Sequence, residues 1–275
     1  MFYVTKVDGR RQPFEKQKII NTCVRMRLSE KQAEAVAGRI EQKLYDGITT
    51  KKILDMIFTF AKEYKPEIKH RINLRESISL LRPKPDFEQF VRLVLESYGY
   101  EIKSNQLLRG KCVEHEIDGI VKKDNQTVCL EVKHHYNSHT YTGIGVCLEA
   151  QATFEDLRDG FGREHTIKFN KAMIVCNTKF SDHAKQYAAC KGIELIGWNM
   201  PKNSCLEEMI EDRKLYPITF LKNLDEKDEA RLADAGIVLL NQLIDYDELE
   251  LCKRTRIPKR KIRFLKKLAE QFMKK

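Results

Sequence analysis

Long hydrophobic runs are missing from this 275-residue chain. No apolar stretch approaches the roughly 18 residues that a membrane-spanning helix needs. The opening MFYVTKVDGRRQPF lacks the layout of a secretory signal peptide, because charged side chains appear at Lys6 and Asp8 before any apolar segment could form. These absences predict a soluble, cytoplasmic protein.

Paired cysteines are missing as well. The eight cysteines stand singly, with no CxxC pair and no Cys/His cluster at zinc-binding spacing. This pattern excludes a zinc finger and predicts reduced thiols that pack as small apolar side chains. Low-complexity tracts and long repeats are absent too. With 42% hydrophobic residues, the chain is long enough for two or three folded domains.

Positive charge is in excess. The formal net charge is +10, which favours a polyanionic partner. The charges are also segregated: residues 253–267 hold nine Lys or Arg and no acid, whereas residues 225–250 hold nine acids. A basic stripe next to an acidic one predicts a directed binding surface near the C-terminus.

Prolines and glycines divide the chain into three segments. In residues 1–82, a short strand precedes apolar spacing typical of helices at 15–27, 29–45, 49–64 and 66–81. Ser29 and Thr49 or Thr50 are suitable N-caps, and Gly47 is a suitable helix stop. The two prolines of RPKPD (residues 82–86) mark a boundary.

Helices and strands alternate in residues 86–200. Two strands flank KDNQ, a helix follows at about 146–159, and AMIVC, a helix ending at Lys191 and IELIG form a βαβ unit with parallel strands. After a linker that holds at least one helical turn, residues 218–275 form short helices. The sequence therefore predicts a multidomain α+β protein, with a helical domain (1–82), a central mixed α/β sheet domain (86–200) and a small all-α domain (218–275).

An unusual acid pair lies in the central segment. A two-residue turn at Asp124-Asn125 pairs residues whose numbers sum to 249, which places Asp118 opposite Glu131 on one face of a half-buried hairpin. Lys133, two residues further on, points to the same face, and the alternate residues Val128, Leu130 and Val132 point into a core.

Facing carboxylates destabilise a sheet unless a cation lies between them. Two such groups suit Mg²⁺, which keeps waters for a substrate, and the lysine would serve a water or stabilise charge on a phosphate. The arrangement predicts metal-assisted phosphodiester hydrolysis. An ordinary surface ion-pair cluster is the alternative, and a one-residue slip in register would separate the acids.

The segments FEQFVRLVLESYGYEI, EIDGIV, VCLEVKHH and FNKAMIVCNTKFSDHAKQYAACKGIELIG occur in the order found in Mrr-type restriction endonucleases of the PD-(D/E)xK superfamily, which residues 86–200 resemble. The resemblance implies Mg²⁺ or Mn²⁺ held by Asp118, Glu131 and the Val132 carbonyl, with Lys133 catalytic. Glu88 matches a supporting position on the first helix. Nearby His115, His134, His135 and His139 are expected to be hydrogen-bonded, solvated or in contact with phosphate, and Gln151 to face the site or solvent.

The N-terminal segments VTKVDGRRQPFEKQKI and YDGITTKKI resemble the ATP-cone, a regulatory domain that binds ATP or dATP. The resemblance implies nucleotide contacts from six residues: Val4, Lys6, Val7, Lys18, Ile19 and Thr50. Lysines can meet phosphates as point charges, and Asp8-Gly9 suits a tight turn. Val7 and Leu54 depart from residues common in the family. The single glycine of the turn excludes a P-loop, so ATP hydrolysis is not expected.

The basic tail resembles tandem helix-hairpin-helix domains, which hold DNA backbones without reading sequence. The expected contacts surround Ile257-Pro258, and they are Lys253, Arg254, Arg256, Lys259, Arg260, Lys261 and Arg263. Glycine is scarce here, with only Gly236. Dimerisation or docking on another protein is the alternative.

Together these features predict a metal-dependent endonuclease acting on double-stranded DNA, regulated by ATP or dATP and active as a homodimer or higher oligomer. Two alternatives stay open: a nucleotide-sensing DNA-binding regulator without catalysis, and a structure-specific junction-resolving nuclease.

Overall fold

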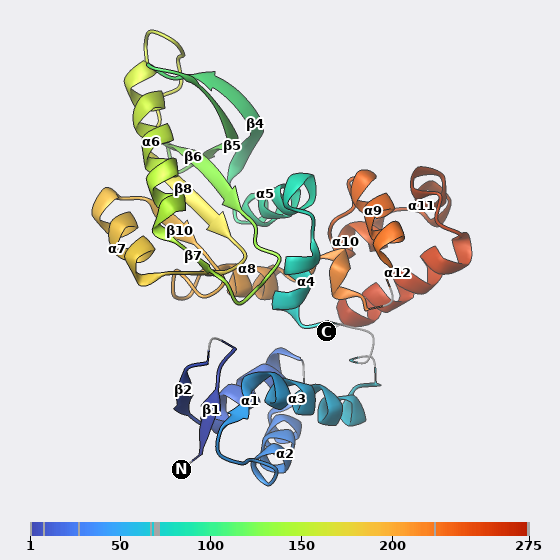
Figure 1. The fold of residues 1–275 in the computed structure, drawn as a ribbon. Coiled ribbons are helices and arrows are strands. Elements are labelled where there is room, and N and C mark those ends of the chain that lie inside the picture. The colour runs from blue at the N-terminus through green and yellow to red at the C-terminus, as the bar shows by residue number, and fades with distance from the viewer. Residues whose placement is uncertain are drawn as a thin grey trace. The chain divides into compact units, whose positions relative to one another are not determined.

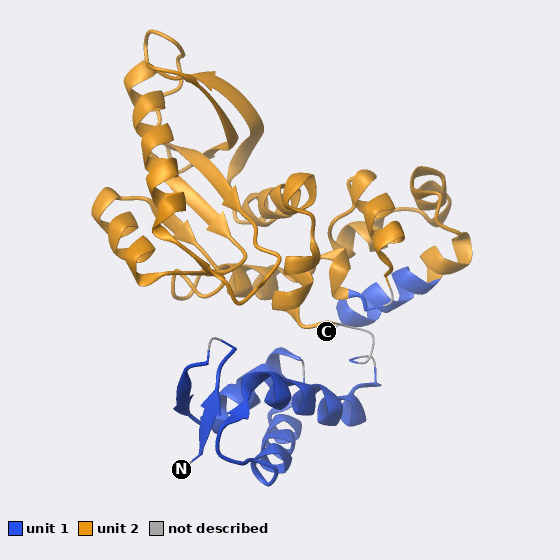
Figure 2. Cartoon of the chain, in the orientation of Figure 1, with its two compact units in different colours: residues 1–71, 221–223, 264–275 blue, residues 72–220, 224–263 orange. Residues whose placement is uncertain are grey.

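The computed structural model describes residues 2–7, 9–26, 28–66, 68, 72–222 and 224–273. The chain divides into two compact units (Figure 2), one made of residues 1–71, 221–223 and 264–275, the other of residues 72–220 and 224–263. Among the described helices, none has the length and apolar character needed to cross a membrane.

In the described part of residues 1–71, the first unit combines a small sheet with three helices (Figure 1). The sheet has the order β2-β1-β3, and its strands are β1 (Tyr3–Thr5), β2 (Arg11–Pro13) and β3 (Ile48–Thr49). The helices are α1 (Lys16–Arg25), α2 (Glu30–Glu41) and α3 (Thr50–Tyr64). Ser29 forms a capping box with Gln32, and Thr49 caps α3, as predicted.

The helix predicted at residues 66–81 is largely wrong. Its only α-helical part is α4 (Leu74–Leu80), which belongs to the second unit and is capped by Asn73. Residues 67 and 69–71 lie outside the described residues. The cap explains the later start, because the Asn73 side chain accepts a hydrogen bond from the Arg75 backbone.

A five-stranded mixed sheet organises the second unit, in the order β10-β8-β6-β5-β4 (Figure 1). The strands are β4 (Glu101–Arg109), β5 (Glu114–Lys123), β6 (Gln126–Lys133), β8 (Lys171–Cys176) and β10 (Glu194–Ile196). Neighbours β4, β5 and β6 are antiparallel, whereas β6, β8 and β10 are parallel. The mixed sheet confirms the predicted fold class, although the long edge strand β4 was not predicted.

The predicted hairpin register is confirmed. Lys123 pairs with Gln126 and Ile120 with Cys129, as the sum of 249 requires. Asp124 and Asn125 have positive φ values of 49° and 61°, which a tight two-residue hairpin turn needs and which these residue types tolerate. Local turn chemistry therefore sets the strand alignment on which the acid pair depends.

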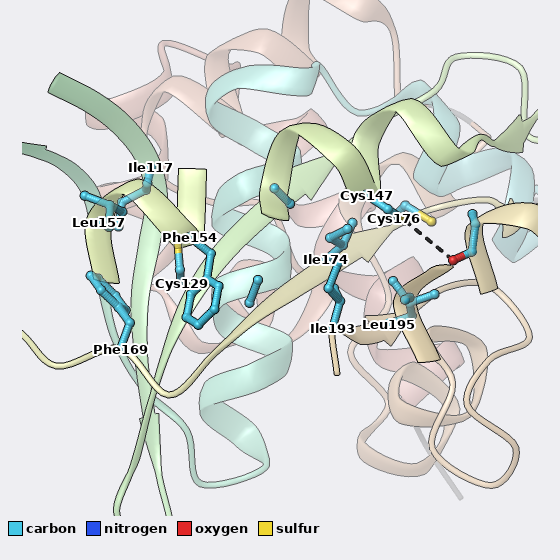
Figure 3. Close-up of a cluster of buried hydrophobic side chains, with 14 of the residues drawn as sticks. Ile117, Cys129, Cys147, Phe154, Leu157, Phe169, Ile174, Cys176, Ile193 and Leu195 are labelled. Atoms are coloured by element: carbon cyan, nitrogen blue, oxygen red, sulfur yellow. Dashed lines mark hydrogen bonds between the residues drawn. The ribbon is translucent and has the colours of Figure 1, made fainter. Parts of the chain in front are cut away.

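Both faces of the hairpin are buried, whereas the sequence predicted one. Ile120 and Cys129, which share a face with the predicted acid pair, pack with Phe154 and Leu157 of α6 (Ile144–Gly160) in a common core (Figure 3). On the other face, Val128 and Leu130 are also buried. The polar site thus lies next to a low-dielectric interior.

Further elements complete the second unit. They are the kinked segment η2 (Pro83–Phe87), in which Lys84 has extended backbone angles, α5 (Glu88–Ser97), the parallel strands β7 (Tyr141–Thr142) and β9 (Lys179–Phe180), α7 (Asp182–Lys191), α8 (Leu206–Arg213) and the short 3-10 helix η3 (Ile218–Phe220). Ser181 and Gly192 bound α7, as predicted. The C-terminal helices are α9 (Glu226–Asp234), α10 (Leu240–Asp245), α11 (Glu248–Thr255) and α12 (Lys259–Met273), of which residues 264–273 fall in the first unit.

Candidate active site

Two carboxylates project from adjacent strands. The paired part of β5 and β6 ends at Gly119 and Leu130, so Asp118 and Glu131 are the next residues on their strands. Asp118 is fixed in place because its Oδ2 accepts a hydrogen bond of 2.7 Å from the backbone N–H of Val132. The hydrogen bond fixes the Asp118 carboxylate of β5 against the part of β6 that carries Glu131 and Lys133.

Glu131 is held in an environment that disfavours its charge. Burial, reinforced by the negative charge of Asp118, raises the pKa of Glu131 to about 7, although Lys133 and Lys84 oppose the shift. The pKa of Glu88, the first residue of α5, is also raised, by burial first and then by the negative charge of Asp118. Three carboxyl groups therefore share one site and compete for compensating positive charge.

Lys133 lies at the end of β6, opposite Cys176 of β8. Its ammonium makes no hydrogen bond or ion pair with another residue that the structure describes. Its ammonium still acts on Glu131 through space, because it lowers the pKa of that carboxyl. Lys133 is therefore available to a substrate while remaining close to the acids.

Lys84 also belongs to the site, although the sequence predicted only a domain boundary at residues 82–86. Its Nζ lies 3.1 Å from Glu88 Oε1, 3.2 Å from Asp118 Oδ1 and 3.4 Å from Glu116 Oε1. Burial opposes its charge, but the hydrogen bond to Glu88 and the charge of Asp118 prevail and raise the pKa of Lys84. Spacing along the chain does not reveal its place in the site, because Glu116 and Asp118 on β5 lie more than thirty positions away.

The donor set fits a hard divalent cation that is only partly dehydrated. Asp118, Glu131 and the neighbouring Val132 carbonyl are oxygen ligands, and Mg²⁺ commonly binds through one or two carboxylates and keeps waters. Across the described part of the chain, no three His, Cys, Asp or Glu side chains converge as a ready-made metal cage. The Lys84 ammonium lies against the same Asp118 oxygen that a cation would use, which indicates that this position favours positive charge.

The neighbouring histidines have structural partners. His134 Nε2 lies 3.1 Å from the Ile78 carbonyl, with its ring 4.9 Å from Phe87. His135 Nε2 lies 3.1 Å from Thr142 Oγ1, and His115 lies 2.8 Å from Asp156 at the β4–β5 connection. Burial lowers the pKa of His134 and of His135, so both favour the neutral imidazole. These contacts agree with the expectation of hydrogen-bonded histidines.

Gln151 of α6 is buried, which rules out the expectation of a solvated helix residue. Its Nε2 donates to Glu155 at 2.7 Å, whereas its Oε1 has no hydrogen-bond partner among the described residues.

Comparisons with known proteins match the three segments separately. Residues 2–77 match the ATP cone domain, residues 82–199 match a restriction endonuclease family of the Mrr catalytic type, and residues 216–273 match the C-terminal domain of AF1548-like proteins. An uncharacterized protein of Archaeoglobus fulgidus is 37% identical over 158 residues, which are 58% of this chain and 86% of the relative. The chain belongs to this AF1548-like family.

A solved family structure supports the same assignment. The crystal structure of a protein of unknown function, AF1548, has a TM-score of 0.58 at 32% identity and covers 72% of this chain and 97% of its own. The structure of Can2 from Sulfobacillus thermosulfidooxidans with cyclic tetra-adenylate covers 66% of this chain and 50% of its own. Its TM-score of 0.31 at 11% identity is too low to carry an argument. The family matches of residues 82–199 and 2–77 confirm the predicted Mrr-type and ATP-cone resemblances, whereas the helix-hairpin-helix likeness stays a prediction.

The residues predicted to bind nucleotide occupy different environments in the ATP-cone. Val4 pairs with Ile48 across β1 and β3, which brings this strand close to Thr50 at the start of α3. The side chains of Val4 and Ile19 are buried in the core of this unit, whereas Val7 is 57% exposed. Lys18 Nζ lies 2.6 Å from Glu15. Lys6 is half-buried. Its backbone N–H donates to the Arg10 carbonyl, and its own carbonyl accepts from the Gly9 N–H, which closes a turn. Asp8, which was expected in this turn, is outside the described residues.

The seven residues predicted to bind DNA in the AF1548-like C-terminal domain divide into two groups. Three have partners within the domain: Lys261 pairs with Asp225 and Asp228, Arg263 with Glu248, and Arg254 donates to the Ala235 carbonyl. The other four have exposed side chains without an ion pair to another described residue, and they are Lys253, Arg256, Lys259 and Arg260. Lys259 and Arg260 lie in the first turn of α12, which contains no acid, at the positive end of that helix dipole, whereas Lys253 lies in the last turn of α11 and Arg256 is its C-cap.

Proposed function

We propose that the chain is a metal-dependent endonuclease that hydrolyses phosphodiester bonds of double-stranded DNA and responds to ATP or dATP. The observation that carries the proposal is the grouping of Asp118, Glu131 and Lys133 at adjoining strand positions of the restriction endonuclease segment. Glu131 gains from a cation because burial and Asp118 disfavour its charge. The hydrolytic centre would lie in residues 86–200, between a nucleotide-binding domain (1–82) and a DNA-binding domain (218–275).

Asp118, Glu131 and the Val132 carbonyl would hold Mg²⁺ or Mn²⁺. When bound, the ion would supply Lewis-acid stabilisation of charge on the scissile phosphate. The Val132 N–H keeps the Asp118 carboxylate oriented, since it occupies Oδ2 and leaves Oδ1 toward the site. Glu88 would support the cluster as a third carboxylate, held by its ion pair with Lys84.

Lys133 would meet the substrate. Its ammonium has no partner among the described residues, so it would contact the attacking water or a phosphate oxygen without first breaking an ion pair. A fixed positive charge beside a developing oxyanion lowers the barrier most when little solvent must reorganise, and the partly buried strand end provides that setting.

The two flanking domains would supply substrate and regulation. The unpaired cations Lys253, Arg256, Lys259 and Arg260 would neutralise DNA phosphates, while Lys261 and Arg263 keep the domain folded around them. In the ATP-cone, Lys6, Lys18 and the chain around Val7 and Thr50 would contact the nucleotide, supported by the buried Val4 and Ile19.

Cleavage of supercoiled plasmid with Mg²⁺ or Mn²⁺ tests the enzymatic part. Wild type should nick or linearise the DNA, and Lys133→Ala should lose this activity. Lys122→Ala is a matched control, because Lys122 is an exposed lysine on the neighbouring strand β5. DNA binding without cleavage of linear, methylated, unmethylated or branched DNA would overturn the nuclease and favour a regulator.

Two further comparisons test the remaining parts. Preference for branched over linear DNA would identify a junction-resolving nuclease. ATP and dATP should change the cleavage rate of wild type but not of Lys6→Ala, whose loss of a phosphate-facing charge should weaken nucleotide binding. An identical nucleotide response in both proteins would contradict the assignment of this residue.

A further inference from the structure

Lys84 brings a positive charge into the acid cluster from within the chain. Its ammonium contacts Glu88, Asp118 and Glu116 at 3.1, 3.2 and 3.4 Å. Both oxygens of Asp118 are thereby engaged, Oδ1 by Lys84 and Oδ2 by the Val132 N–H. Lys84 therefore already occupies the side of Asp118 that faces the site.

The backbone that carries Lys84 is firmly anchored. Prolines stand on both sides of it, at 83 and 85. The preceding residue, Arg82, donates two hydrogen bonds to the buried Asp86, at 2.7 and 2.9 Å, and a third to Asp234 of α9. Since Asp86 is only 1% exposed, this ion pair holds the segment in one position.

The side chain of Lys84 is far less constrained than its backbone. It is 59% exposed, although its partners Asp118 and Glu88 are 9% and 11% exposed. A lysine has four rotatable bonds and a strongly hydrated ammonium, so it can leave the cluster for solvent without moving the chain. The Lys84 backbone is therefore fixed, whereas its ammonium can move between the acid cluster and solvent.

A divalent cation and this ammonium cannot share Asp118 Oδ1. A metal ion bound to that oxygen would lie within a few ångströms of Nζ, where two positive charges repel by well over RT at the effective dielectric of a protein surface. Binding of the metal thus requires Lys84 to move out, and removal of the metal leaves three carboxylates that attract it back.

We propose that Lys84 is a built-in counter-ion that holds the place of the divalent cation and is displaced when the metal binds. The proposal rests on the metal site of the proposed function. Lys84 would then stabilise the metal-free site, weaken its metal affinity and, once released, place a free ammonium at the rim of the site beside the substrate.

Calorimetric titration of the full chain with Mn²⁺ tests the competition. Lys84→Met removes the charge but keeps most of the length, and it should bind Mn²⁺ about tenfold more tightly than wild type, since no ion pairs must be broken. Lys84→Arg keeps the charge and should stay near wild type, as should Lys122→Met. Equal or weaker binding by Lys84→Met would overturn the proposal.

Amine labelling tests displacement directly and needs no variant that could misfold. Wild-type protein is treated with an acetylating reagent with and without Mn²⁺, and each lysine is quantified by mass spectrometry. Labelling of Lys84 should rise several-fold with Mn²⁺, whereas labelling of Lys122 should not change. Unchanged labelling of Lys84 in protein that calorimetry shows to bind Mn²⁺ would overturn displacement while leaving the nuclease intact. Absence of Mn²⁺ binding in wild type, Lys84→Met and Asp118→Asn alike would instead remove the metal site and the proposed nuclease with it.

Discussion

Removing the Arg82 guanidinium should destabilise the second unit, because it leaves the buried carboxylate of Asp86 without its ion-pair partner. Asp86 is 1% exposed and receives both of its side-chain hydrogen bonds from Arg82, at 2.7 and 2.9 Å. Deleting one partner of such a pair typically costs about 3–5 kcal/mol. Since the Arg82 side chain is itself 40% exposed, we expect Arg82→Ala to cost about 3 kcal/mol, at the low end.

Thermal unfolding of the full chain measures this cost. For a unit of this size, about 1 kcal/mol corresponds to a shift of roughly 2–4 °C in Tm, so Arg82→Ala should lower the transition of the second unit by about 6–12 °C. Arg158→Ala is the control, because Arg158 and its partner Asp159 are 51% and 45% exposed. An exposed pair contributes about 1 kcal/mol or less.

The double variant Arg82→Ala/Asp86→Ala separates charge burial from lost packing. It removes the charge as well as its partner, so it should be more stable than Arg82→Ala alone. Two results would contradict the argument that the buried charge of Asp86 determines the stability of this segment. The first is a loss of stability in Arg82→Ala no larger than that in Arg158→Ala. The second is a loss in the double variant larger than the sum of the losses in Arg82→Ala and Asp86→Ala.

Further predictions concern pH, DNA and packing. Burial, with the charge of Asp86, raises the pKa of Glu229 to about 7. The folded state therefore binds this proton more tightly than the unfolded state, and the resulting stability is complete below about pH 4 and is lost as the pH rises to about 7. Glu229→Gln should remove that loss and be more stable than wild type at alkaline pH by about 1–3 kcal/mol in urea unfolding; parallel pH profiles would argue against it. Lys259→Ala and Arg260→Ala should each weaken DNA binding and reduce the slope of log affinity against log salt concentration by about 1, measured by fluorescence anisotropy. Lys261→Ala breaks ion pairs with Asp225 and Asp228, so it should mainly lower Tm. A change of about 1 in the salt slope of Lys261→Ala would contradict this assignment. A methyl group at Gly110 would lie 2.2 Å from Asp156 Oδ2, which accepts from the Val113 N–H, so Gly110→Ala should cost about 1–3 kcal/mol, and Gly143→Ala, with open space around it, should serve as the unaffected control.

Features that depend on neighbours along the chain could be predicted from residue type and spacing. The turn at Asp124-Asn125 sets the β5–β6 register, and the register brings Asp118 and Glu131 to adjoining positions. Ser29 and Ser181 begin helices because each side chain accepts a hydrogen bond from the backbone three residues ahead. Such interactions span a few residues, so residue type and spacing suffice to predict them.

The groups that complete the site from distant parts of the chain could be found only from the folded structure. Lys84 reaches Asp118 across 34 positions, and Arg82 reaches Asp234 across 152, so neither contact leaves a periodic pattern in the sequence. The same holds for burial: alternation predicted one covered face of the hairpin, but packing against α6 buries Ile120 and Cys129 on the other. That burial raises the pKa of Glu131, because the cost of a charge depends on everything packed around it rather than on its neighbours in the chain.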